Sequence, residues 1–126
     1  MAKAVVDPME VPPLPLAELH ILLALADGEK HGYAVMREVE RMTDGEVRMG
    51  PGTLYGAIKR MLGANLVEET EERPDPDVDD QRRRYYRVTG LGVRALAAET
   101  ERLERLVSTA HAKQVRRRLE PGVQGA

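Results

Sequence analysis

Residues 50–63 carry polar side chains among glycines, a combination that could bind the phosphates and bases of a nucleic acid. The candidates for such contacts are Thr53, Tyr55, Lys59 and Arg60. Glycines let a backbone approach a phosphate closely, and hydroxyl groups can donate to its oxygens. Lys and Arg can neutralise phosphates or reach guanine edges. The alternative is a solvated helix face whose glycines are tolerated for packing.

A second candidate for nucleic-acid contact is the basic and aromatic run of residues 82–87. It begins with Arg82, Arg83 and Arg84 and ends in Arg87. In a strand, alternate side chains share a face, so basic residues near the strand's start could lie along a DNA backbone. The alternative is cross-strand pairing with the acids of residues 68–72. We expect both, with the outermost arginines left for DNA.

The charge distribution argues against indiscriminate binding to polyanions. The 126-residue chain has a net charge of −2 and a sequence pI near 5.9. Its positive charge is local, because residues 81–94 hold five arginines and no acid, whereas residues 66–80 are strongly acidic. Four of those acids lie in residues 75–80, and the spacing of Asp75, Asp77 and Asp79 matches the first three ligand positions of a calcium loop. Asp80 and Tyr86 then stand where that loop needs Gly and Glu, so we expect a solvated hairpin tip.

The sequence offers no constellation for catalysis, a cofactor or a metal. It has no Cys, Trp or Phe and one serine, Ser108. The histidines His20, His31 and His111 are scattered. Neither the HExxH motif nor a glycine-rich nucleotide loop is found. The longest apolar run, residues 22–26, is too short to cross a membrane, and no signal-peptide pattern opens the chain. We expect a cytoplasmic protein without membrane contact that is not an enzyme.

Apolar spacing and turn residues predict four helices and a hairpin. The first helix ends at Asp27 and Gly28, and the second runs from Tyr33 to a stop near Asp44 and Gly45. Gly50 and Pro51 open the third helix as its cap and first residue. Strands are expected at residues 66–70 and 83–88, and the last helix should run from Thr89 to about Arg118.

Three short helices followed by a hairpin are typical of a winged helix-turn-helix, whose recognition helix lies in the major groove. We therefore predict a mainly α fold with a small β-hairpin, consisting of a winged helix-turn-helix and a long C-terminal dimerisation helix. Residues 1–13 are expected to form a flexible arm, 14–88 the winged domain, 89–118 the last helix and 119–126 a flexible tail.

The last helix carries an apolar stripe that needs a partner, because an isolated amphipathic helix buries nothing. Its length would be roughly 43 Å at ~1.5 Å per residue. A second copy of the chain is the natural partner. The predicted interface positions are Leu96, Leu103, Leu106, Val107 and Ala110, with Val115 at the end of the stripe.

Several sequence blocks, which follow one another between about residues 14 and 115, together resemble the PadR-like transcriptional regulators. They are the leucine-rich residues 19–25, His31-Gly32-Tyr33, Gly52-Thr53-Leu54-Tyr55 continuing to Met61, Asn65-Leu66-Val67, and residues 84–89 followed by Gly92. The single C-terminal helix is similar to the shorter branch of the family.

The resemblance implies a homodimeric repressor that binds double-stranded DNA at an inverted-repeat operator and responds to a small apolar or phenolic effector. The DNA-contacting positions it implies are Thr53, Tyr55, Lys59 and Arg60, with wing residues around Arg82 to Arg84. For His31 and Tyr33 it favours packing and capping, with phosphate contact as the alternative. The rival interpretation of the whole chain is a winged-helix module whose third helix docks a protein, which would show exposed apolar anchors there.

Overall fold

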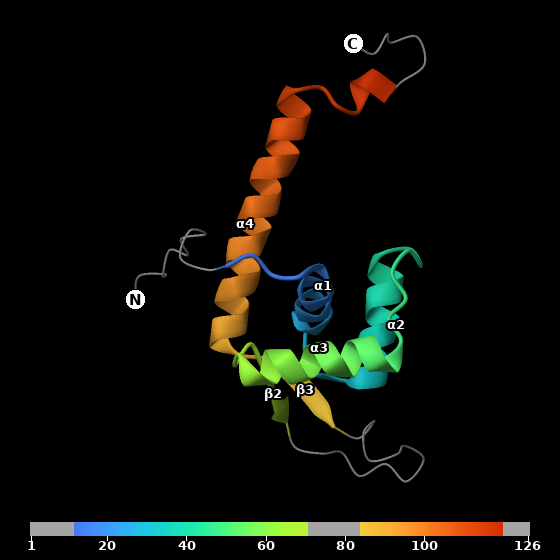
Figure 1. The fold of residues 1–126 in the computed structure, drawn as a ribbon, viewed down its shortest axis with the longest axis vertical. Coiled ribbons are helices and arrows are strands. Elements are labelled where there is room, and N and C mark those ends of the chain that lie inside the picture. The colour runs from blue at the N-terminus through green and yellow to red at the C-terminus, as the bar shows by residue number, and fades with distance from the viewer. Residues whose placement is uncertain (1–11, 71–83, 120–126) are drawn as a thin grey trace.

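The computed structural model describes residues 12–70 and 84–119 (Figure 1). Its elements, in chain order, are α1 (Leu16–Leu25), β1 (Lys30–His31), α2 (Gly32–Met42), α3 (Pro51–Gly63), β2 (Val67–Thr70), β3 (Tyr85–Val88), α4 (Gly90–Ala112) and the 3-10 turn η1 (Arg117–Leu119). The predicted fold class is confirmed: the chain is mainly helical, with a small antiparallel sheet in a winged-helix arrangement. Residues 1–11 and 120–126, most of the predicted arm and tail, lie outside the described residues.

Helix α1 is the centre of the fold because it contacts α2, α3 and α4. It is apolar on most of its surface, which suits a helix with neighbours on several sides. Ile21 and Leu22 are fully buried, and they join residues of α2, α3 and the sheet in one core. Figure 1 shows α2 and α4 on opposite sides of α1, with α3 crossing beneath α1 and α2. This packing leaves one face of α3 free of the core.

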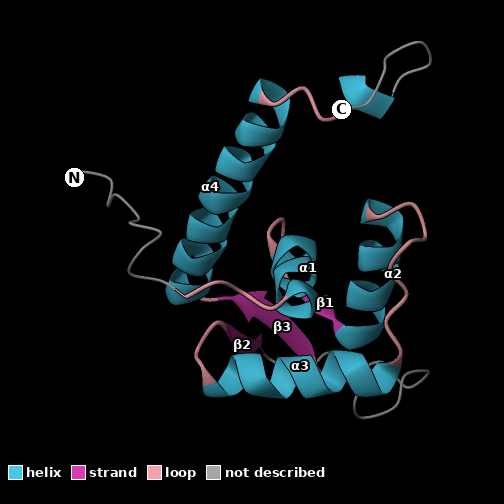
Figure 2. Ribbon diagram, turned by 45° about the horizontal axis from the view of Figure 1, so that its top comes forward, coloured by secondary structure: helices cyan, strands magenta, loops and turns pink. Residues whose placement is uncertain are grey.

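The sheet has three strands in the order β1-β3-β2, with β3 in the centre (Figure 2). The predicted hairpin is present, and Val67 pairs with Val88 at its base. Strand β3 begins at Tyr85 rather than at residue 83, which lies outside the described residues. Strand β1 was not predicted, because two residues are too few to show alternation. It forms where Lys30 pairs with Tyr86 just before α2.

The expected end of the last helix, near Arg118, is wrong, because α4 ends at Ala112. Gln114 adopts a left-handed conformation with φ 56°. Its N–H donates to the carbonyl of His111, and the N–H of Val115 donates to that of Ala110. These two bonds form a Schellman motif, which closes a helix. The 23 residues of α4 therefore span roughly 35 Å, and Val115 lies beyond the helix.

The start of α4 is fixed on the turn that ends α3. Thr89 caps α4 by accepting from the N–H of Gly92 at 3.0 Å, and its hydroxyl donates to the carbonyl of Asn65 at 2.5 Å. The N–H of Thr89 donates to the carbonyl of Leu66 at 3.1 Å. A Cβ at Gly92 would overlap that same carbonyl oxygen. The close approach of two backbones therefore requires glycine at position 92.

The substitution Gly92→Ala tests this contact, with Gly90→Ala as its matched control. Alanine normally stabilises a helix relative to glycine, but at position 92 it must push against a backbone carbonyl. We expect Gly92→Ala to lower the free energy of unfolding by about 1–3 kcal/mol. At position 90 a Cβ meets no described atom within 4 Å, so Gly90→Ala should be neutral or slightly stabilising. Urea titration followed by circular dichroism measures both, and equal effects would contradict the proposed contact.

Candidate nucleic-acid interface

Helix α3 has one buried face and one exposed face. Leu54, Ala57, Ile58 and Met61 are buried in the core. The exposed positions are Pro51, Gly52, Thr53, Lys59, Arg60 and Gly63. Three of the four side chains predicted to touch DNA on this helix, those of Thr53, Lys59 and Arg60, therefore reach solvent. The glycines leave the helix backbone uncovered between them.

Tyr55 is placed differently from the other three, because its ring packs against α2. A Cβ at Gly32, the first residue of α2, would stand within 2.7 Å of Cζ of Tyr55. The absence of a side chain at position 32 is what makes room for the half-buried ring. The two sequence blocks around Gly32 and Tyr55 thus meet in space and join α2 to α3.

The beginning of α2 carries two further candidates, His31 and Tyr33. Nδ1 of His31 accepts from the N–H of Ala34 at 3.0 Å and so caps α2. The His31 ring also lies edge-on to Tyr85, with centroids 5.4 Å apart. Tyr33 is exposed, and the guanidinium of Arg37 lies 5.0 Å from its ring centroid. His31 thus has the packing and capping role favoured from the sequence, whereas Tyr33 and Arg37 form a surface cation–π pair.

On the wing, the described arginines face acids of the neighbouring strand. Nε of Arg87 lies 2.7 Å from Glu68, and Nη1 of Arg84 lies 3.7 Å from Glu69. Cross-strand pairing, one of the two outcomes expected from the sequence, is therefore present. Such exposed pairs contribute only about 0.2–1 kcal/mol each, so they can exchange partners. Arg82, Arg83 and the acidic tip at residues 75–80 lie outside the described residues.

The two cations of α3 differ in their partners. Nε of Arg60 lies 3.7 Å from Oε1 of Glu18 on α1. Lys59 makes no ion pair within residues 12–70 and 84–119. Sequence reasoning missed both Glu18 and Arg37. Nothing in the sequence distinguishes Glu18 from a solvated acid of a first helical turn, because its burial depends on how α1 crosses α3.

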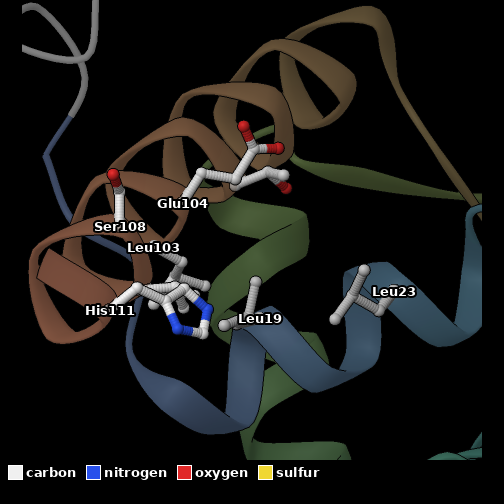
Figure 3. Close-up of a pocket in the computed structure, with 8 residues that line it drawn as sticks. Leu19, Leu23, Leu103, Glu104, Ser108 and His111 are labelled. Carbon is white, nitrogen blue, oxygen red and sulfur yellow. The ribbon is translucent and has the colours of Figure 1, made fainter. Parts of the chain in front are cut away.

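An apolar groove lies between α1 and α4, with a volume of about 580 Å³ (Figure 3). Leu19 and Leu23 of α1 face residues of α4 across it. The α4 side is formed by Thr100, Leu103, Glu104, Val107, Ser108 and His111. The apolar part of this lining consists of Leu and Val side chains. Tyr33 does not line the groove, because it belongs to α2 on the far side of α1 (Figure 1).

The predicted interface residues of α4 fall into two groups. Leu96 packs against the core of its own chain, and Ala110 is half-buried. Leu103, Leu106 and Val107 are 39%, 66% and 55% exposed. The first half of α4 is therefore anchored on the winged domain through buried residues such as Ala95 and Ala98, while the second half presents apolar side chains to solvent.

Among the described residues, no group of three or more His, Cys, Asp or Glu side chains is arranged to hold a metal ion. Within the same part of the chain, none of the helices combines the length and apolarity that a membrane crossing requires.

Comparison with known proteins places these features in a family context. The model of the PadR-like family of transcriptional regulators matches residues 21–98. An uncharacterized 37.1 kDa protein of a Streptomyces fradiae transposon is 37% identical over 90 residues, which are 71% of this chain and 24% of the relative. The chain thus spans about a quarter of the length of that relative.

Solved structures share the fold. A PadR family transcription regulator from Clostridium difficile superposes with a TM-score of 0.64 at 21% identity, covering 79% of this chain and 99% of its own. The Bacillus subtilis PadR, solved in complex with operator DNA, superposes with a TM-score of 0.57 at 16% identity, covering 66% of this chain and 45% of its own.

Proposed function

We propose a sequence-specific DNA-binding function for this chain, which belongs to the PadR-like family of transcriptional regulators. The family consists of transcription regulators rather than enzymes. The finer proposal is a cytoplasmic repressor that acts as a homodimer on an inverted-repeat operator and releases it in response to a small effector.

The exposed face of α3 carries the DNA-binding proposal. It combines uncovered backbone at Gly52 and Gly63 with the exposed side chains of Thr53, Lys59 and Arg60. A major groove admits a helix of this kind, and its base edges offer acceptors to Lys and Arg. Wing residue Arg84, with Arg82 and Arg83 as predicted neighbours, would follow the adjacent backbone. The Bacillus subtilis PadR, which shares the fold, was solved in complex with operator DNA, and this supports DNA as the ligand.

The rival function, docking of a protein on α3, would call for exposed apolar anchors on that helix. The exposed large apolar residues of the described chain lie on α1, α2, α4 and the segment after α4, and none lies on α3. This distribution favours DNA as the partner of α3. It indicates that α4, rather than α3, makes apolar contacts with another protein chain.

Alanine substitutions at Lys59 and Arg60 test the recognition helix. We expect Lys59→Ala to weaken binding to every duplex and to reduce the salt dependence by about one ion, as a lost phosphate contact does. Arg60→Ala should cost about 1–3 kcal/mol and relax base preference at one position. Fluorescence anisotropy with a duplex from the chain's own upstream region measures both. Lys113→Ala, which removes the same charge from the end of α4, is the control. Wild-type affinity in both α3 variants would exclude α3 as the recognition helix.

The exposed half of α4 supports dimerisation. Contiguous apolar patches on a soluble protein are commonly covered by a partner. Leu103 and Val107 share a groove with Leu19 and Leu23 of α1, and Leu106 is exposed on the same half of α4. A second copy brings an equal surface, and an isologous contact between two such helices buries both at once. The dimer would place two α3 helices on half-sites about 34–36 Å apart.

The variant Leu103→Asp is expected to be monomeric, because a carboxylate in an apolar interface loses its hydration without gaining a partner. Sedimentation velocity measures whether the variant is a monomer or a dimer, and circular dichroism checks that it folds. Thr109→Asp, at an exposed position on the same helix, should remain dimeric. Operator affinity should fall with the dimer. An intact dimer in Leu103→Asp would place the interface elsewhere.

The groove between α1 and α4 supports an effector site. Its volume of about 580 Å³ falls within the range of small-molecule pockets, which are mostly apolar with a few polar groups. Ser108 and His111 are polar groups of the lining. The imidazole of His111, which points toward Leu19 in Figure 3, could receive a phenolic hydroxyl while Leu19 contacts the ring. A compound bound there could change the spacing of the two recognition helices, by no more than its differential affinity for the two spacings.

Thermal unfolding in the presence of a panel of phenolic and apolar aromatic compounds tests the effector site. We expect at least one compound to raise the melting temperature and to release DNA. Ser108→Trp should abolish both effects by filling the groove. A panel that neither stabilises the protein nor releases DNA would argue against ligand response while leaving DNA binding intact.

A further inference from the structure

Glu18 is the one acid of the described chain that forms an ion pair with a cation of α3. It lies in the first turn of α1, where the helix dipole favours a negative charge. Its side chain is only 10% exposed, whereas that of its partner Arg60 is 64% exposed. The carboxylate is therefore held by the packing of α1, and the guanidinium is the movable member of the pair.

The side chain of Arg60 bends back along its own helix. Nη1 of Arg60 lies 3.7 Å from the point where a Cβ of Gly56 would stand, one turn earlier in α3. Helical side chains point toward the N-terminus, and the missing side chain at position 56 leaves this path open. The charged end of a residue near the end of α3 is thus brought over the N-terminal half of the helix, the half that contacts base edges in helix-turn-helix proteins.

The atom that faces Glu18 is Nε, at 3.7 Å from Oε1. A guanidinium has five N–H donors in a rigid fork. When a carboxylate attracts the Nε side, the two Nη groups at the other end of the fork remain available. Those two groups form the end-on, bidentate contact with O6 and N7 of a guanine.

We propose that Glu18 is a positioning residue for DNA recognition: it orients the guanidinium of Arg60 over Gly56 for a bidentate contact with a guanine. This inference rests on the proposed function. It adds a residue of α1, outside the recognition helix and the wing, to the groups that determine base preference. A charge at position 60 alone would attract phosphates, and the carboxylate converts it into a directional donor.

A double-mutant cycle between positions 18 and 60 tests the proposal. The probes are a duplex that the wild-type protein selects from a random-sequence pool and a scrambled duplex of equal composition. Glu18→Gln keeps the size of the side chain and removes its charge. We expect it to weaken binding to the selected duplex by about three- to tenfold and to change binding to the scrambled duplex by less than about twofold. In the Arg60→Ala background, Glu18→Gln should have no further effect.

Two further variants complete the design. Arg60→Lys keeps the positive charge but lacks the fork, so it should retain the salt dependence of binding while losing preference for the selected duplex. It supports or contradicts the proposal even where Glu18→Gln is poorly folded. Glu101→Gln, which neutralises an exposed acid paired with Arg105 on α4 at 3.2 Å, is the control and should bind both duplexes as the wild type does.

The outcomes separate this inference from the proposed function. Additive losses in the cycle, or tighter binding by Glu18→Gln, would overturn the positioning role and leave the DNA-binding function standing. A preference fully retained in Arg60→Lys would do the same. Failure of the wild type to select any duplex, or an Arg60→Ala variant with unchanged binding, would overturn both.

Discussion

The carbonyl of Leu66 is the point on which the arrangement of this chain depends. It follows the left-handed residue Asn65 that ends α3, it accepts from the N–H of Thr89, and it lies against the bare backbone of Gly92. One peptide group thus joins the end of α3, the base of the hairpin and the start of α4. The bond to Thr89 and the approach of Gly92 both involve main-chain atoms of Leu66. Rotation of α4 against the end of α3 would therefore strain these contacts.

This rigidity gives the proposed dimer a means of transmitting change. In a symmetric dimer built on α4, the distance between two α3 helices would depend on how the α4 helices cross. The groove between α1 and α4 is lined by Leu103 and Val107, two of the positions proposed for the dimer interface. Packed interfaces tend to have discrete arrangements rather than a continuous range, so in the proposed dimer a small change in the groove would shift the spacing between the two α3 helices. A second close contact, between the Tyr55 ring and Gly32, holds α2 against α3.

The sequence predicts those parts of the fold that local chemistry determines. Gly50 and Pro51 mark the start of α3, and α2 ends close to Asp44 and Gly45, both of which have positive φ. The sequence does not predict the end of α4. Gln114 adopts the left-handed conformation that glycine usually adopts at a helix end, and a glutamine does not indicate such an end. Strand β1 depends on pairing with β3, which is 54 or more residues away in the chain. Glu18 was missed for a similar reason: its role depends on the crossing of α1 and α3.

The pairing of cations with acids determines how much of the interface charge is available to DNA. Arg60, Arg84 and Arg87 each lie within 4 Å of a carboxylate, and the whole chain is slightly acidic. Non-specific binding depends almost entirely on phosphate neutralisation, so the exposed carboxylates beside Arg84 and Arg87 weaken it. A specific contact suffers less, because an arginine whose Nε faces an acid still presents its remaining donors in a fixed direction. In the proposed interface, Lys59, which has no ion pair within the described residues, would supply the undirected part of the attraction. An interface of this composition would gain its affinity from hydrogen-bond donors directed at particular acceptors of the DNA bases. Only a DNA sequence that places those acceptors opposite the donors would then be bound tightly.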